Sequence, residues 1–382
     1  MKAIRNGRIL MPDGQVEGRA LLFDETIIGL VNPDDLPSDA EIIDAGGLFV
    51  SPGLVDIHIH GYGGADASDG DADGIRQMAA GIAQNGVTAW CPTTMTVPQE
   101  KLRAVFTQMR ALREASRAPG WQGAEILGVH AEGPFINPSR KGAQKADNIL
   151  PPDADFLRPY ADILRVVTLA PEMPGALDCI RIIAGETTIL ISMGHTDASY
   201  EQAMAAIAAG LHHATHTFNA MTGLSHRAPG VVGAALTAPI TAELIADTFH
   251  VHPGLFPLML RAKGDQLILI TDCTRAGGMA DGEYDLGGQP IFVKGIECRL
   301  SDGTIAGSVL KLNHAVTNLA KHAALPLYEA VRYASHSPAK AIGEANKGTL
   351  EPGMDADIVL MDVDCEVSRT IVRGRTVYQR KR

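Results

Sequence analysis

The sequence has few cysteines, and their arrangement matches no known disulfide framework. Five cysteines are scattered over 382 residues, and no two of them form a Cys-x-x-Cys motif. Such an odd, dispersed set argues against a disulfide-stapled fold and against a thiolate metal site. We therefore expect a reducing, cytoplasmic compartment.

Positive charge is also scarce. The chain has 33 Lys and Arg against 44 Asp and Glu, a net charge of −11, and it has no basic tail or patch. This balance argues against nucleic acids and anionic membranes as partners. No apolar run approaches the length of a membrane span, and the first residues, MKAIRNGRILMPDG, lack the apolar core of a signal peptide. A small-molecule ligand is the expected partner.

Several catalytic and nucleotide-binding motifs are missing as well. The sequence contains no GxxxxGK[ST] loop and no GxGxxG fingerprint, so nucleotide binding has no support. It also lacks the GxSxG motif of serine hydrolases. Cys91 and Cys273 are expected to be small buried apolar groups rather than nucleophiles.

From residue 52 onward, apolar runs alternate with amphipathic helical patterns. In the helical pattern SYEQAMAAIAAG, Ser199 and Gln202 have the spacing of a capping box. Eight strands that are buried on both faces and alternate with helices predict an α/β fold, a (β/α)₈ TIM-like barrel. The eight apolar runs are GLVDIHIH, GVTAWCPT, EILGVHAEG, LRVVTLAPE, TTILISMGHT, HHATHTFN, AELIADTFH and QLILITD.

The two ends of the chain share a different texture. Residues 1–51 and 345–382 read as short strands separated by turns that contain Gly, Pro and Asp. We expect these two segments to form one small β-sandwich domain, with the barrel spanning residues 52–344. Residues 284–308 read as a β-hairpin inserted after the eighth run.

Most of the apolar runs end in a polar residue, and histidines and carboxylates predominate among these residues. The active site of such a barrel lies at the C-terminal ends of its strands. Polar residues also mark the point where any strand becomes a loop, but a ring of His, Glu and Asp without lysine favours a metal site. His58 and His60, in the first run, also share one strand face. The residues that end the runs are His60, Thr93, Glu132, Glu172, His195, His216, His250 and Asp272.

Longer motifs carry a family resemblance. PGLVDIHIHG near the start of the barrel and LEPGMDADIVL near the C-terminus resemble the amidohydrolase superfamily. HAEGPF, MGHTDAS, ATHTFNAMTGLSHRAPG, IADTFHV, LITDCTRAGG and GTIAGS are similar, in the same order, to the N-acetylglucosamine-6-phosphate deacetylase family. The resemblance covers essentially the whole chain.

The resemblance implies a metal centre. Glu132, His195 and His216 would hold the principal divalent ion, and His58 and His60 would complete a second position with Glu132 as the bridge. One or two ions per subunit are expected, because some relatives work with a single metal. Imidazole and carboxylate ligands suit Zn²⁺ or Fe²⁺.

The resemblance also implies a catalytic residue and a set of substrate contacts. Asp272 would be the general base and acid, although an aspartate in such a position is often only a cap or loop residue. Arg227 would bind the phosphate across a homodimer, and Gln144 stands where some relatives have a histidine that contacts substrate. The expected substrate-binding residues are Ala143, Gln144, Asn219, Ala220, Arg227, His250, Ile305, Ala306 and Gly307.

The expected reaction is hydrolysis of the acetamide of N-acetylglucosamine 6-phosphate, in amino-sugar catabolism. Deacetylation of the galactosamine isomer or of another N-acyl compound remains an alternative, because fold alone does not fix the substrate. A cyclic-amide hydrolase is disfavoured, since no lysine ends a strand. A barrel that has lost catalysis is also possible, but no expected ligand is missing.

Overall fold

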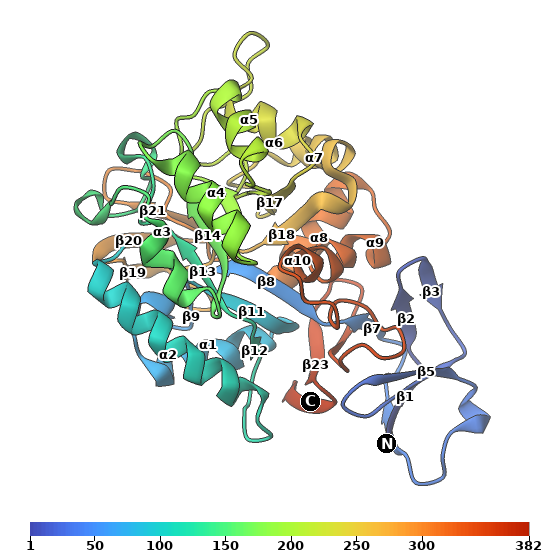
Figure 1. Cartoon of the computed structure of the whole chain (residues 1–382). Coiled ribbons are helices and arrows are strands. Elements are labelled where there is room, and N and C mark those ends of the chain that lie inside the picture. Colours follow the sequence, from blue (N-terminus) through green and yellow to red (C-terminus); the bar gives the residue numbers. More distant parts are fainter. Residues whose placement is uncertain (382) are drawn as a thin grey trace.

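The computed structural model describes residues 1–381 and contains the predicted barrel (Figure 1). Neighbouring barrel strands pair in parallel, in the order in which they occur along the chain. All eight predicted runs are therefore confirmed as strands of one sheet. They are β8 (Leu54–Ile59), β11 (Val87–Thr94), β13 (Val129–Glu132), β14 (Leu164–Leu169), β15 (Leu190–Met193), β16 (His213–Ala214), β17 (Thr241–Ile245) and β18 (Leu267–Ile270).

Backbone contacts at one end of the sheet bring its first and last strands together. The amide of Asp272, just beyond β18, donates to the carbonyl of His58 at 2.9 Å. The amide of His60 donates to the carbonyl of Cys273, also at 2.9 Å. These two hydrogen bonds close the barrel at the C-terminal ends of its strands. They also place the polar end of the eighth strand directly beside the two histidines of the first.

Helices cover the outside of the barrel (Figure 1). The predicted capping box is confirmed, because the Ser199 hydroxyl accepts from the amide of Gln202 while the Gln202 side chain accepts from the amide of Ser199. No helix within residues 1–381 has the length and apolar character needed to traverse a bilayer. The α-helices are α1 (Ala72–Ala83), α2 (Gln99–Arg117), α3 (Ala154–Leu157), α4 (Ala176–Glu186), α5 (Tyr200–Ala208), α6 (Gly230–Thr237), α7 (Phe256–Lys263), α8 (Leu312–Ala323), α9 (Leu327–Arg332) and α10 (His336–Ala341).

The two chain ends build mixed β-sheets beside the barrel (Figure 1). One sheet has the order β5-β4-β1-β6, and a second joins both ends of the chain in the order β24-β23-β22-β7-β2-β3. The expected pairing of the two ends is confirmed, whereas the domain boundaries at 51/52 and 344/345 stay a prediction. The strands are β1 (Lys2–Arg5), β2 (Arg8–Met11), β3 (Gly14–Val16), β4 (Ala20–Phe23), β5 (Ile27–Val31), β6 (Glu41–Asp44), β7 (Phe49–Pro52), β22 (Ile358–Met361), β23 (Val367–Val372) and β24 (Arg375–Gln379).

A buried lysine ties the C-terminal segment to the barrel. The Lys347 ammonium lies 2.9 Å from Glu125, 2.8 Å from Asp355 and 2.9 Å from Asp357. Glu125 belongs to β12 (Glu125–Ile126), a short strand paired with β11. Burial alone would lower the pKa of Lys347, but the three carboxylates raise it by a larger amount. The pKa therefore lies above its usual value, and the lysine stays charged. Because removing one member would leave the others buried and uncompensated, this network holds the two parts together.

The predicted insertion is present and contains one strand more than a hairpin. It forms a three-stranded antiparallel sheet of β19 (Gly282–Leu286), β20 (Gln289–Lys294) and β21 (Glu297–Leu300). The side chain of Gln289 donates to the carbonyl of Ala143 at 2.6 Å. This contact fixes the inserted sheet against the loop that follows β13, at the end of the barrel where the polar strand ends gather.

Candidate metal centre and substrate cavity

The polar residues reach the barrel mouth through an unusual backbone conformation at the strand ends. Glu132 is the last residue of β13, whereas His195, His216 and Asp272 each lie two residues beyond their strands. These last three have φ angles of +50°, +29° and +49°. Residues other than glycine rarely adopt positive φ, and such outliers gather at functional sites. The strained turns mark this end of the barrel as the candidate site.

One group of converging side chains consists of Glu132, His195 and His216. Glu132 Oε1 lies 3.2 Å from His195 Nε2 and 3.0 Å from His216 Nε2. The two ring nitrogens are 3.1 Å apart. Nδ1 of His195 donates to the carbonyl of Arg140 at 2.9 Å. In a neutral ring this leaves the lone pair of Nε2 pointing at Glu132.

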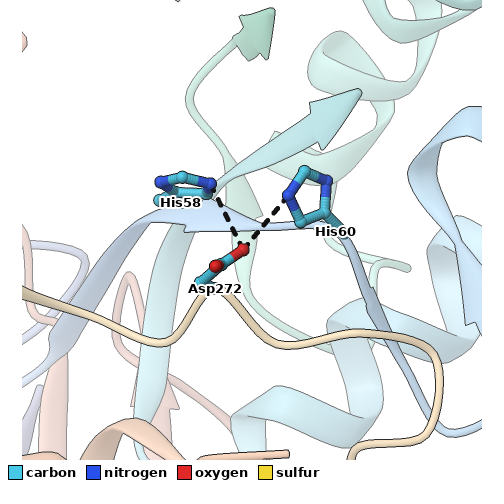
Figure 2. Close-up of side chains that lie close together, drawn as sticks. All are labelled: His58, His60 and Asp272. Carbon is cyan, nitrogen blue, oxygen red and sulfur yellow. Dashed lines mark ion pairs between the residues drawn. The ribbon is translucent and has the colours of Figure 1, made fainter. Parts of the chain in front are cut away.

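A second group adjoins the first and consists of His58, His60 and Asp272 (Figure 2). Asp272 Oδ1 lies 3.4 Å from His58 Nε2 and 3.2 Å from His60 Nε2. Glu132 is shared between the groups, with Oε1 at 3.4 Å from His58 Nε2 and Oε2 at 3.3 Å from His60 Nε2. Nδ1 of His60 contacts the carbonyl of Thr93 at 3.1 Å, so its neutral ring also turns a lone pair toward the carboxylates.

These donors fit a divalent cation better than they fit one another. Lone pairs of neutral imidazoles that face carboxylate oxygens repel them, and a cation between them turns repulsion into attraction. His58 Nε2 is buried and has no hydrogen-bond partner among residues 1–381. Burial lowers the pKa of His60, but Asp272 and Glu132 raise it to about 10. The site therefore favours positive charge, and its imidazole and carboxylate donors suit Zn²⁺ or Fe²⁺.

Five of the six residues in the two groups line a cavity of about 410 Å³, and His58 is buried outside its lining. Six of the eight residues predicted at strand ends reach it: His60, Glu132, His195, His216, His250 and Asp272. The other two support the backbone instead. The Thr93 hydroxyl accepts from the amide of Ile59 at 2.9 Å, and Glu172 accepts from the Thr196 hydroxyl and from the amide of Asp197.

The structure brings most of the predicted substrate-binding residues to this cavity. Ala306 is fully buried and lies outside the lining, between two residues that belong to it. Arg227 is exposed on the loop before α6. Among the residues that the structure describes, it is not part of the cavity lining. The predicted residues that line the cavity are Ala143, Gln144, Asn219, Ala220, His250, Ile305 and Gly307.

Both polar ends of the Gln144 side chain are already engaged. Its Oε1 accepts from the amide of Thr96 at 2.7 Å, which fixes the orientation of the amide group. Its Nε2 therefore donates to Glu132 Oε2, at 2.5 Å. Gln144 thus holds the carboxylate that both groups share, while its predicted contact with substrate stays a prediction.

His250 is held by a neighbouring carboxylate. Its Nδ1 donates to Asp247 Oδ2 at 2.6 Å, and Asp247 Oδ1 accepts from the amides of Phe249 and His250. Thr248, at the centre of this turn, has a φ of +69°. Glycine adopts that conformation most easily, so the β-branched Thr248 is held in a strained turn.

The sequence reasoning missed one buried carboxylate below the histidines. Glu243, in the middle of β17, is 0% exposed, and its Oε2 lies 2.8 Å from His58 Nδ1. The same oxygen accepts from the amide of His216 at 2.8 Å. A charged residue inside the apolar run AELIA was the signal that could have revealed it, because a buried charge needs partners.

Comparison with known proteins places this geometry in a family. Residues 49–377 match the family described as "Amidohydrolase family". The chain is 36% identical to an N-acetylglucosamine-6-phosphate deacetylase of Bacillus subtilis, over 99% of this chain and 94% of that protein. It is 34% identical to an N-acetylgalactosamine-6-phosphate deacetylase of Escherichia coli O157:H7, over 97% of this chain and 98% of that protein.

A solved structure also matches this chain over its full length. A mutant N-acetyl-D-glucosamine-6-phosphate deacetylase of Mycobacterium smegmatis, in complex with N-acetyl-D-glucosamine-6-phosphate, has a TM-score of 0.91 to this chain. The two are 30% identical, and the match covers 99% of each chain. This chain therefore belongs to the amidohydrolase family, within its N-acetylglucosamine-6-phosphate deacetylase branch.

Proposed function

We propose that this protein hydrolyses the acetamide of N-acetylglucosamine 6-phosphate to glucosamine 6-phosphate and acetate, in amino-sugar catabolism. The observation that carries the proposal is the cluster at the barrel mouth, where Glu132, His195, His216 and Asp272 face one cavity. Amide hydrolysis needs a strong nucleophile near neutral pH and a group that moves protons. The full-length match to a relative solved with this sugar phosphate supports the choice of substrate.

Glu132, His195 and His216 would hold the principal ion. His58 and His60 would hold a second ion, with Glu132 shared between the two positions. When bound, a divalent ion there lowers the pKa of a water molecule towards 7 and polarises the amide carbonyl. The backbone partners of His195 and His60 keep both Nε2 lone pairs directed at the ion positions.

Asp272 and His250 carry the remaining chemistry. Asp272 takes a proton from the attacking water and returns one to the departing sugar amine. Its Oδ1 already lies within 3.4 Å of His58 and His60. Asp247 accepts from Nδ1 of His250 and fixes the ring at the cavity, where it contacts the acetyl group of the substrate.

Recognition of the phosphate is proposed to involve a second subunit. Arg140, the arginine that lines the cavity, is paired with Asp197 at 2.8 Å. Arg227 is exposed and outside the cavity of its own chain, and nearby Leu224 is 54% exposed. We infer a homodimer in which Arg227 reaches the neighbouring cavity. We also propose a cytoplasmic location, since all five cysteines are free and buried.

A second candidate substrate is N-acetylgalactosamine 6-phosphate. The Escherichia coli O157:H7 relative named for that isomer is almost as similar to this chain as the Bacillus subtilis one. The two sugars differ in the configuration of one hydroxyl group. A site can reject such an isomer strongly only if it hydrogen-bonds that hydroxyl directly.

Acetate release from a substrate panel tests the function. The panel contains N-acetylglucosamine and N-acetylgalactosamine, each with and without the 6-phosphate. We expect the highest kcat/KM for N-acetylglucosamine 6-phosphate, because recognition of the phosphate favours the phosphorylated sugars and a relative was solved with the glucosamine isomer. Preference for the galactosamine isomer would favour the second candidate. Turnover confined to the unphosphorylated sugars, or no acetate at all, would refute both.

Replacing Asp272 with Asn should lower kcat by about a hundredfold or more, because an amide cannot take up and return the proton. Elemental analysis of the same preparation should show that the ion held by Glu132, His195 and His216 is retained. The matched control is Glu283→Gln, which neutralises an exposed carboxylate of β19. Near-normal turnover in the Asp272 variant would remove it from the mechanism.

Replacing Arg227 with Ala should raise KM for the phosphorylated sugar by about tenfold or more, the scale of a charge-assisted hydrogen bond. KM for the unphosphorylated sugar should stay unchanged. Arg261→Ala, at another exposed arginine, in α7, is the control. Mixing Arg227→Ala with Asp272→Asn should restore activity, because a mixed dimer has one site with both residues intact. Equal effects on both sugars, or no complementation, would contradict a shared site.

A further inference from the structure

Glu243 lies on the inner side of the barrel, beneath the cavity. It is the central residue of β17, and its side chain is completely buried. Both carboxylate oxygens contact other strands. Oε1 lies 3.1 Å from Nε2 of His213, in β16, and Oε2 lies 2.8 Å from Nδ1 of His58, in β8. A single side chain therefore links the first strand of the barrel to the sixth and seventh.

The contact with His58 fixes the protonation of that ring. An ionised carboxylate can only accept hydrogen bonds, so His58 Nδ1 must carry the proton. Nε2 of the neutral ring then holds a lone pair, directed at the space beside Glu132 and Asp272, whose nearest oxygens are both 3.4 Å away. His58 is therefore set to act as a ligand by a residue that itself lies outside the cavity.

The same oxygen of Glu243 also supports the other group of ligands. The backbone amide of His216 donates to Oε2 at 2.8 Å. His216 has a φ of +29°, an uncommon conformation that needs such support from its surroundings. Glu243 Oε2 thus contacts one residue from each of the two groups, His58 from one and His216 from the other.

The far side of Glu243 is held as well. His213 contacts Glu243 through Nε2, and His213 Nδ1 lies 2.6 Å from the hydroxyl of Thr241. These contacts give Oε1 of Glu243 a partner on the side away from His58. Rotation of the carboxylate away from His58 would leave buried polar groups without partners, which is costly.

We propose that Glu243 is a positioning residue that makes His58 a metal ligand and joins the two ion positions into one unit. This inference rests on the proposed function only in assuming that the cluster binds divalent ions. A carboxylate bound to a ligating imidazole increases the basicity of that ligand and fixes its tautomer. Its negative charge also offsets part of the repulsion between two neighbouring cations.

The test is titration of metal-free protein with Zn²⁺ in the calorimeter, with bound ions counted by elemental analysis. The wild type should bind two ions per chain. Glu243→Gln should weaken the ion at His58 and His60 by about tenfold to a hundredfold, the usual effect of losing such a partner. The ion at Glu132, His195 and His216 should weaken much less, because Glu243 contacts only the backbone amide of His216 and not its ligating ring.

Two further variants separate positioning from general destabilisation. Glu125→Gln also neutralises a buried carboxylate in the barrel sheet, but one that binds Lys347. It should lower thermal stability and leave both Zn²⁺ affinities unchanged. Glu243→Gln in a His58→Gln background should cause no further loss of ion binding, since the ligand that it positions is already absent. If Glu243→Gln fails to fold, His213→Gln, which removes the support of Oε1, should weaken the same ion.

Three results would overturn the inference: a wild type that binds one ion, a Glu243→Gln variant that binds both ions normally, or equal losses at both positions. None of these readouts uses substrate, so a failure of the proposed function can be distinguished from a failure of this inference. A wild type that binds two Zn²⁺ ions with the predicted dependence on Glu243, yet releases no acetate, would leave this inference intact.

Discussion

The structure depends on one buried carboxylate, that of Glu132. Its two oxygens lie between 3.0 and 3.4 Å from imidazole nitrogens of His58, His60, His195 and His216. Burial raises the pKa of Glu132, but the surrounding histidines lower it well below its usual range, so it stays ionised. A buried charge of this kind is tolerable only with close partners. Because those partners come from strands far apart in the sequence, the complete barrel is required to assemble them.

The backbone is strained at the turns that present these side chains. His195, His216 and Asp272 occupy left-handed conformations, and cross-strand hydrogen bonds hold the turns in place. Two carboxylates, Glu243 and Asp247, fix the rings of His58 and His250. The rings are thus oriented before any ligand arrives. Donors that are already oriented need little reorganisation during the reaction, which is the main advantage of a preorganised site.

Much of this arrangement could be predicted from the sequence. Apolar runs ending in a polar residue, in most cases His, Glu or Asp, predicted the eight strands and the cavity, because a parallel barrel gathers its strand ends at one face. Glu243 was not predicted because it lies inside an apolar run and not at its end. Its partners also come from strands that are distant in the sequence. The engagement of Gln144 by Thr96 depends on a loop contact that has no local signal. The role proposed for Arg227 depends on a second subunit, so one chain does not reveal it.

Anomalous X-ray diffraction on both sides of the zinc absorption edge, from crystals grown with Zn²⁺, is the most direct test of the central claim that Glu132 organises a metal centre. The account predicts a strong peak about 2.0–2.2 Å from a Glu132 oxygen and from Nε2 of both His195 and His216. A second peak, beside His58 and His60, should share Glu132. Zinc bound elsewhere, with no peak in contact with Glu132, would contradict the account.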